Sequence, residues 1–210
     1  MSETTNTPVD YGQPSDGITA STPKNILFGA GTIHKGLEFT AAESGTGGSW
    51  NFAESLFCAT GDGNSLTIEP EITDIEVDGA WVKVADLQVK TGETATMEIT
   101  PVELTPAVLK AALIGTEATS SGATGFTRID SKERIESGDY IENLGYVGTR
   151  LDGTPIIIIF ERALCTSGME IGGSDKEASK PSLTFECVGK LDDSHRTLPW
   201  HIYYPTVAEG

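Results

Sequence analysis

The sequence is poor in basic residues for its content of acid. It has 14 Lys and Arg against 31 Asp and Glu, which gives a formal net charge of -17 at pH 7. Tight binding to nucleic acid phosphates or to anionic membranes depends on Lys and Arg that displace counterions, so this composition argues against both. Loose contact with DNA stays possible, and so does an acidic surface that serves only solubility.

Cysteines and long apolar runs are also scarce. The three cysteines, Cys58, Cys165 and Cys187, form no Cys-x-x-Cys pair and no cluster with histidine. This pattern argues against a disulfide framework or a zinc site, and we expect buried thiols in a reducing compartment. The longest pure apolar run, residues 156–160, is too short to span a membrane, and the first residues lack the features of a secretory signal.

Motifs that mark enzymes and cofactor sites are missing. The sequence has no P-loop, no Gly-x-Ser-x-Gly elbow and no dinucleotide fingerprint. Residues 192–195 place Asp, Ser and His side by side, but four consecutive residues do not generally converge as a catalytic triad. Residues 62–64 lack the remaining ligands of a calcium loop. We therefore predict no catalytic residue, no metal site and no cofactor.

Composition divides the chain into an arm and a domain. Residues 1–24 are rich in Thr, Ser, Pro and Gly, which predicts a flexible N-terminal arm. Residues 25–210 read as one β-rich domain. The long loop at residues 38–65 is too apolar to stay free in solvent, and it should pack on its own sheet or on another subunit. Its large apolar residues are Trp50, Phe52, Leu56 and Phe57.

Residues 65–79 alternate apolar and acidic side chains. The alternation slips once near Thr73 and Asp74, which predicts a β-bulge, and Pro70 favours an edge strand. The acidic members are Glu69, Glu71, Asp74, Glu76 and Asp78. Residues two apart on a strand stand about 6.6 Å apart along it, so these carboxylates form a like-charged row and not a chelate.

The next segment predicts a hairpin. Thr91-Gly92 is a candidate turn, and the strand after it alternates so that its apolar residues face inward. These inward residues are Ala95, Met97 and Ile99.

A change of period then predicts a short flanking α-helix at about residues 105–114. Thr105 is a good N-cap and Pro106 suits the first helical position. Val108, Leu109, Ala112 and Leu113 form one apolar stripe. Gly115 is placed to end the helix in the left-handed conformation.

The run at residues 156–160 predicts a strand with two apolar faces. Exposing an isoleucine costs about 1.5–3 kcal/mol, so both faces should be covered. The helix after Thr105 covers one of them, or a neighbouring subunit does. Ile157 and Ile159 share one face, and we take them as candidates for contact between subunits.

Several phrases resemble, as a set, the major tail protein of long-tailed bacteriophages and prophages of Gram-positive hosts. They are "ATGDGNSLTIEPEITDIEVDGA", "VKTGETATMEITPVELTPAVLKAALIG", "ALCTSGMEI", "SLTFECVGKLD" and "PWHIYYP". The resemblance covers most of residues 58–115 and 155–205 in order. It implies a β-sandwich or barrel-like tail tube fold with long loops, terminal arms and no catalytic residue.

The resemblance also implies a structural role in the virion tail, assembled in the host cytoplasm. Subunits would form hexameric rings that stack into a tube, and double-stranded DNA would pass through the lumen without specific binding. Its partners would be other copies of itself, the tape measure protein, the tail terminator and the baseplate or distal tail proteins, with no membrane. The arm and the loop at residues 38–65 are our candidates for contact between rings.

A lumen that lets DNA slide should offer few cationic anchors. We therefore expect the five carboxylates of residues 69–78 on or near a strand that faces the tube interior or its rim. An outward solvated face is the equal alternative. The rival function is a monomeric β-sandwich binding module of carbohydrate or adhesion type, with Trp50, Trp81 or Trp200 as a stacking platform. A small hydrolase that uses His195 or His201 comes third.

Overall fold

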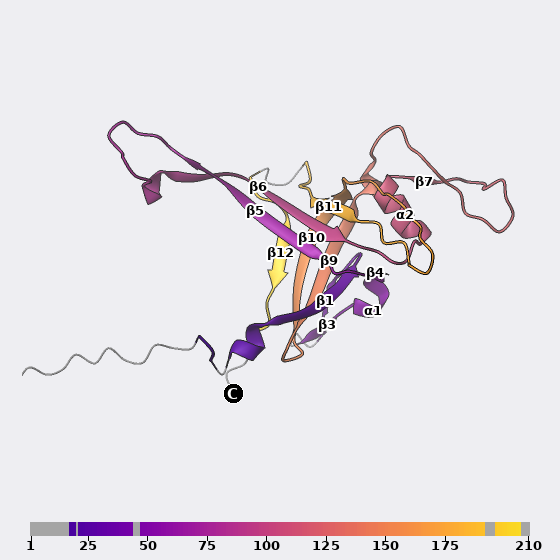
Figure 1. Ribbon diagram of the computed structural model, residues 1–210, viewed down its shortest axis with the longest axis horizontal. Helices are drawn as coiled ribbons and strands as arrows, with labels where there is room; N and C mark the ends of the chain where they lie inside the picture. Colours follow the sequence, from indigo (N-terminus) through magenta and orange to yellow (C-terminus); the bar gives the residue numbers. More distant parts are fainter. Residues whose placement is uncertain (1–16, 20, 44–46, 192–195, 207–210) are drawn as a thin grey trace, which may run out of the picture.

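The computed structural model describes residues 17–19, 21–43, 47–191 and 196–206. The chain is mainly β and barrel-like, with a curled sheet of eight strands in this part and one substantial helix (Figure 1). The predicted fold class is therefore confirmed. The strand order is β4-β1-β9-β10-β11-β6-β5, and β12 pairs with β10.

The strands of the main sheet pair antiparallel throughout. They are β1 (Leu27–His34), β4 (Leu56–Cys58), β5 (Ser65–Asp74), β6 (Gln88–Ile99), β9 (Ile141–Arg150), β10 (Pro155–Cys165), β11 (Leu183–Cys187) and β12 (Trp200–Tyr203). Two small sheets join β2 (Phe39–Ala41) to β3 (Gly48–Trp50) and β7 (Thr116–Glu117) to β8 (Ile129–Asp130). The helical elements are α1 (Phe52–Ser55), α2 (Pro106–Leu113) and the 3-10 turns η1 (Thr22–Asn25), η2 (Ala85–Leu87) and η3 (Ser137–Asp139).

The main core lies between the sheet and α2. Ala95, Met97 and Ile99 are fully buried there, as the alternation of β6 predicts. Val108 and Ala112 of α2 pack into the same cluster. All three cysteines are buried and unpaired, in agreement with the sequence.

Helix α2 begins as predicted and ends one residue differently. The hydroxyl of Thr105 accepts a hydrogen bond from the Val108 amide at 3.3 Å, so Thr105 is the N-cap. The left-handed residue after the helix is Ile114, with φ 51°, and not Gly115. A Cβ on Gly115 would lie 2.7 Å from Ile129, so this glycine is required for close packing against β8.

Strand β10 is covered on both faces by its own chain. Phe160 faces the core cluster that contains α2, whereas Ile157 and Ile159 point to the opposite side. There a second cluster covers them, formed with Leu37, Trp50, Phe52 and Val147. The prediction that both faces are covered is confirmed, and no neighbouring subunit is required for it.

The predicted hairpin turn at Thr91-Gly92 is wrong. Strand β6 runs through both residues, and its hairpin partner is the preceding strand β5. Gly92 instead marks a bulge, because Glu71 pairs with Gly92 while the next residue of β5 pairs with Lys90. The extra residue of this bulge is Thr91 on β6, so the bulge expected in β5 near Thr73 and Asp74 is instead in the partner strand, close to the same place. Strand β5 is an edge of the sheet, which is the position that Pro70 favours.

Candidate assembly surfaces

The β5–β6 hairpin extends beyond the body of the sheet. Its paired register runs from Ser65 opposite Glu98 to Asp74 opposite Gln88. Strand β11 pairs with β6 only from Thr96 to Ile99, so within the described residues the outer half of the hairpin has no third strand beside it. Figure 1 shows this two-stranded ribbon running to the upper left, with residues 75–87 at its tip.

Apolar side chains gather on the outer part of this ribbon and are exposed. Trp81 is 96% exposed and Val82 is 77% exposed. The other exposed large apolar residues of the hairpin are Ile72, Ile75, Val77, Val84 and Val89. Monomeric proteins rarely leave a large contiguous apolar surface in water, so this concentration makes the ribbon a candidate interaction surface. The name "apolar tip" is used below for residues 75–87.

Polar contacts close the apolar tip into a defined shape. The Ile75 amide donates to the Leu87 carbonyl at 2.8 Å, where the ribbon opens into the tip. The Lys83 ammonium lies 2.7 Å from the Asp74 carboxylate, and the Gln88 side chain donates to the same carboxylate at 2.8 Å. These two hydrogen bonds lower the pKa of Asp74 below its usual value. The tip is thus an ordered turn with its apolar residues outward.

All five carboxylates of the predicted acidic row lie on this hairpin. Glu69 and Glu71 are exposed on the outer edge strand, and Asp74 is paired with Lys83. Glu76 and Asp78 are exposed in the apolar tip. The row therefore follows a projecting edge and does not spread over a broad sheet face. Charge on an edge strand also discourages uncontrolled pairing with other strands.

An aromatic pocket of about 300 Å³ lies on the other side of the sheet from α2. It is lined by Phe39, Trp50, Pro155, Ile157, Tyr203, Tyr204 and Pro205, none of which is charged. Phe39 and Trp50 are register partners in β2 and β3, with ring centres 5.4 Å apart. Tyr203 meets the Trp50 ring edge-on at 5.0 Å and pairs with Ile157 on β10. We call this cavity the aromatic pocket.

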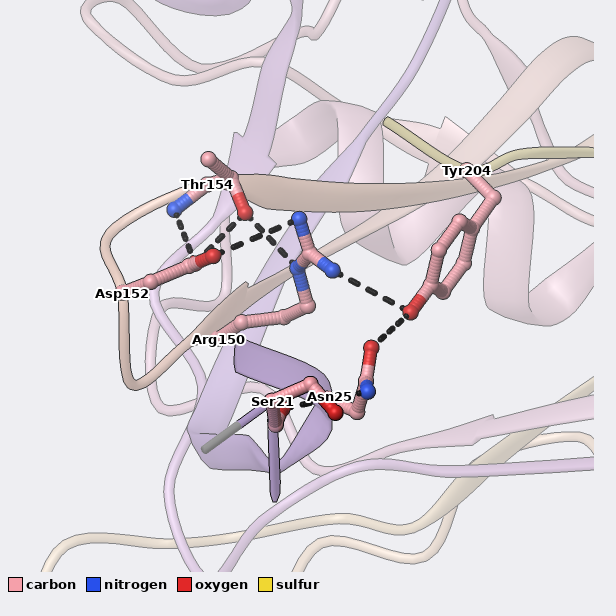
Figure 2. Close-up of polar contacts among 6 residues, drawn as sticks. All are labelled: Ser21, Asn25, Arg150, Asp152, Thr154 and Tyr204. Atoms are coloured by element: carbon pink, nitrogen blue, oxygen red, sulfur yellow. Dashed lines mark hydrogen bonds and ion pairs between the residues drawn. The ribbon is translucent and has the colours of Figure 1, made fainter. Parts of the chain in front are cut away.

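A polar network fixes Tyr204 at the rim of this pocket (Figure 2). The Tyr204 hydroxyl accepts a hydrogen bond from Arg150 at 3.1 Å and donates one to Asn25 at 2.6 Å. Arg150 is 2% exposed, donates to the Thr154 hydroxyl at 2.7 Å and lies 3.5 Å from the Asp152 carboxylate. The network connects η1, the β9–β10 turn and the segment after β12, which are distant in sequence.

The predicted contact residues between subunits fall into two groups. Phe57 and Ile159 are buried by residues of their own chain. Ile157 is also buried, but it lines the aromatic pocket. Phe57 and Ile159 are therefore poor candidates for contact between subunits, whereas Ile157 could be contacted only through the pocket. Trp50 and Phe52 pack on the chain's own sheet but remain partly accessible, and Leu56 is exposed. Trp50 belongs to the aromatic pocket, where a neighbour can reach it.

Neither described histidine is hydrogen-bonded to both a hydroxyl and a carboxylate, as a catalytic triad requires. His34 is buried between the hydroxyls of Thr32 at 2.8 Å and Ser55 at 2.9 Å, and burial lowers its pKa. A triad requires a carboxylate on the second ring nitrogen, where His34 has Thr32. His201 contacts Glu161 on the exposed side of β12. His195 lies outside the described residues.

A larger cavity beside β6 is lined by four basic residues, Lys90, Arg162, Lys190 and Arg196. Its volume is about 980 Å³. Lys90 is paired with Glu93, while Arg162 and Lys190 both lie within 4.0 Å of Glu142. Glu93 and Glu142 thus offset only part of the positive charge of these three residues.

The described residues contain no group of three or more His, Cys, Asp or Glu side chains placed to hold a metal ion. No helix in the same part of the chain is long and apolar enough to cross a bilayer.

Sequence reasoning missed the apolar tip and most of the aromatic pocket. The sequence did contain a signal for the tip. Trp81 and Val82 are adjacent apolar residues after Gly79, and neighbours on a strand point to opposite faces, so one inward face could not bury both. The pocket had one in the aromatic cluster of "WHIYYP". No protein-family model matches this chain, and no curated protein is significantly similar to it.

Proposed function

We propose that this protein is a structural subunit that assembles with copies of itself into stacked hexameric rings, forming the tail tube of a long-tailed phage. The apolar tip carries the proposal. Several large apolar side chains project from a ribbon that nothing else in the described chain covers, and burial of each is worth about 1.5–3 kcal/mol. A subunit built to bury them against another copy accounts for this exposure.

The open edges of the sheet support the same function. The strand order ends at β4 and β5, and in the part of the chain that is described no strand pairs with the outer side of either. Unpaired edge strands present backbone donors and acceptors to other chains. A ring of subunits joined through their sheets would satisfy these groups.

The charge of the chain fits a conduit for DNA. With a net charge of -17, the surface offers phosphates more repulsion than attachment. Glu69 and Glu71, on the outer edge of the ribbon, are the acidic pair that we propose to face the lumen or its rim. The tape measure protein, tail terminator and baseplate or distal tail proteins are the further partners that this function would require.

The test is the assembly state of the purified full chain. Size-exclusion chromatography with light scattering should show concentration-dependent oligomers, and negative-stain images should show rings or hollow filaments. A protein that stays monomeric at every concentration, with no rings in the images, would contradict the proposal.

The aromatic pocket favours one second candidate, a monomeric binding module. Its aromatic lining suits a small apolar or sugar ligand. This alternative predicts a stable monomer whose tryptophan fluorescence changes with added mono- or disaccharide. Trp200 is a poor platform in this reading, because it packs against the main core.

A further inference from the structure

We propose that the apolar tip of one copy inserts Trp81 into the aromatic pocket of a second copy. This inference rests on the proposed self-assembly and names the two surfaces that join. One surface is a projecting indole that is almost fully exposed, and the other is an uncharged recess lined by aromatic rings.

The size of the pocket limits what can enter it. Ligand pockets span about 300–1,000 Å³, and this pocket lies at the lower end with about 300 Å³. Such a recess suits one bicyclic side chain better than an extended ligand. Among the described residues, Trp81 is the most exposed large apolar side chain.

The chemistry of the lining matches an indole. Aromatic rings prefer edge-on or offset contacts at 4.5–7 Å between centres, which add about 0.5–1.5 kcal/mol per pair in general. The Phe39, Trp50 and Tyr203 rings already pack in this way and leave further ring faces and edges toward the pocket. The Tyr204 hydroxyl is engaged by Arg150 and Asn25, so this ring is held in place.

The absence of charge in the lining also matters for this partner. The apolar tip carries Glu76 and Asp78 beside Trp81, so a recess with carboxylates would repel it. None of the seven lining residues is charged. Two acidic molecules can therefore meet here without placing like charges in contact inside the pocket.

The two surfaces cannot be partners within one copy, and this makes the contact head-to-tail. Figure 1 shows the ribbon pointing to the upper left, away from the sheet, whereas β3 and the end of β12 lie beside the lower part of the sheet. When the tip of one copy fills the pocket of the next, that next copy still has a free tip. Such contacts propagate into closed rings or filaments.

The area that Trp81 can bury is that of a single hot-spot residue, so the full interface must be larger. A buried tryptophan contributes about 150–250 Å², while a stable interface buries about 800 Å² on each partner. The exposed Val82 and Val77 add to the apolar contact around the indole. Trp81 is thus the anchor, and the sides of the ribbon and the sheet edges provide the remainder.

The first experiment compares Trp81→Ala with Phe126→Ala in the full chain. Phe126 is another exposed aromatic residue, but it lies in the loop between β7 and β8. Trp81→Ala should weaken association about 30-fold or more, the loss typical of a hot spot, and Phe126→Ala should not. Sedimentation velocity over a concentration series measures both. If both variants self-associated as tightly as the wild type, the inference would be overturned.

The second experiment tests the pocket. Pro205→Trp places a bulky side chain at the pocket rim, after the last strand, and Phe39→Ala removes part of the wall. Each should assemble poorly, and circular dichroism with thermal unfolding checks that each is folded. If both folded variants assembled like the wild type, the pocket would not be the acceptor.

Mixing the variants distinguishes this contact from any other. Trp81→Ala keeps a pocket and Pro205→Trp keeps a tip, so their mixture should form one-to-one dimers that do not grow. At the same concentration, each variant alone should stay largely monomeric, because its own tip-to-pocket contact is weakened. A mixture that stays monomeric would overturn the assignment of tip to pocket. A wild type that never assembles would instead contradict the proposed function itself.

Discussion

Arg150 and Tyr204 are joined both through a hydrogen bond and through the ring face. The guanidinium donates to the Tyr204 hydroxyl at 3.1 Å, and its carbon lies 5.0 Å from the centre of the same ring. Because Arg150 is almost fully buried, it has little water to replace a lost partner. This pair attaches the segment after β12 to the turn between β9 and β10.

Replacing Tyr204 with Phe should therefore destabilise the fold while keeping the ring. The variant loses the acceptor for Arg150 and the donor to Asn25, and hydrogen bonds to charged groups are worth about 1.5–3 kcal/mol. We expect the free energy of unfolding in urea to fall by about that amount. Tyr203→Phe is the matched control, because the Tyr203 ring would still contact Trp50. Equal losses in the two variants would contradict the role given to the network.

His34 should make the fold sensitive to mild acid. Burial lowers its pKa below the usual 6.5, so the unfolded state binds a proton more readily than the folded state. Its contribution to stability is complete above about pH 6.5 and declines as the pH falls through the folded pKa. Denaturation midpoints measured from about pH 7.5 to about pH 5 should show this decline. His34→Gln should lose the decline, and the exposed His201→Gln should keep it.

Glu93 should contribute a second step at lower pH. The hydrogen bond from Lys90, followed by that from the Leu198 amide at 2.8 Å, lowers the pKa of Glu93 below 4.5. The stability from this carboxylate is present above pH 4.5 and is lost as the pH falls through the lower folded value. Glu93→Gln should reduce the acid dependence of the urea midpoint below pH 4.5, and the exposed Glu133→Gln should not. An unchanged acid limb in Glu93→Gln would contradict this assignment.

The local parts of the fold could be predicted from the sequence. Helix α2 followed from the N-cap Thr105 and its apolar stripe, and the inward face of β6 followed from alternation. Both depend on interactions within a few residues. The residue that ends the helix, Ile114, was not predicted. The sequence pointed to Gly115, but this glycine serves a close contact with β8, which is distant in sequence.

The parts that depend on distant pairing could not be predicted. No local sequence feature distinguishes a β6 strand that pairs with β5 from a chain that turns at Gly92, because a glycine suits a bulge as well as a turn. Ile157 and Ile159 need a cover, but alternation does not say that Trp50 and Phe52 provide it. The Arg150 network likewise joins Asn25 to Tyr204 across almost the whole chain. The aromatic pocket depends on such pairings. Its aromatic residues could be recognised in the sequence, but the way in which they come together could not.

Salt should promote assembly if acidic repulsion opposes it. Copies that each carry -17 repel one another, and ionic strength near 0.15 M screens this repulsion over about 8 Å. Light scattering at fixed protein concentration should therefore rise from low to moderate salt in the wild type. A double change, Glu69→Gln with Glu71→Gln, removes two exposed carboxylates from the ribbon edge and should assemble better than the wild type at low salt. Glu133→Gln with Glu177→Gln changes the charge equally at exposed sites away from the ribbon and separates the local effect from the net charge. Polymers that form at low salt and dissociate at moderate salt would show that attraction between charges, and not burial of apolar surface, holds the copies together.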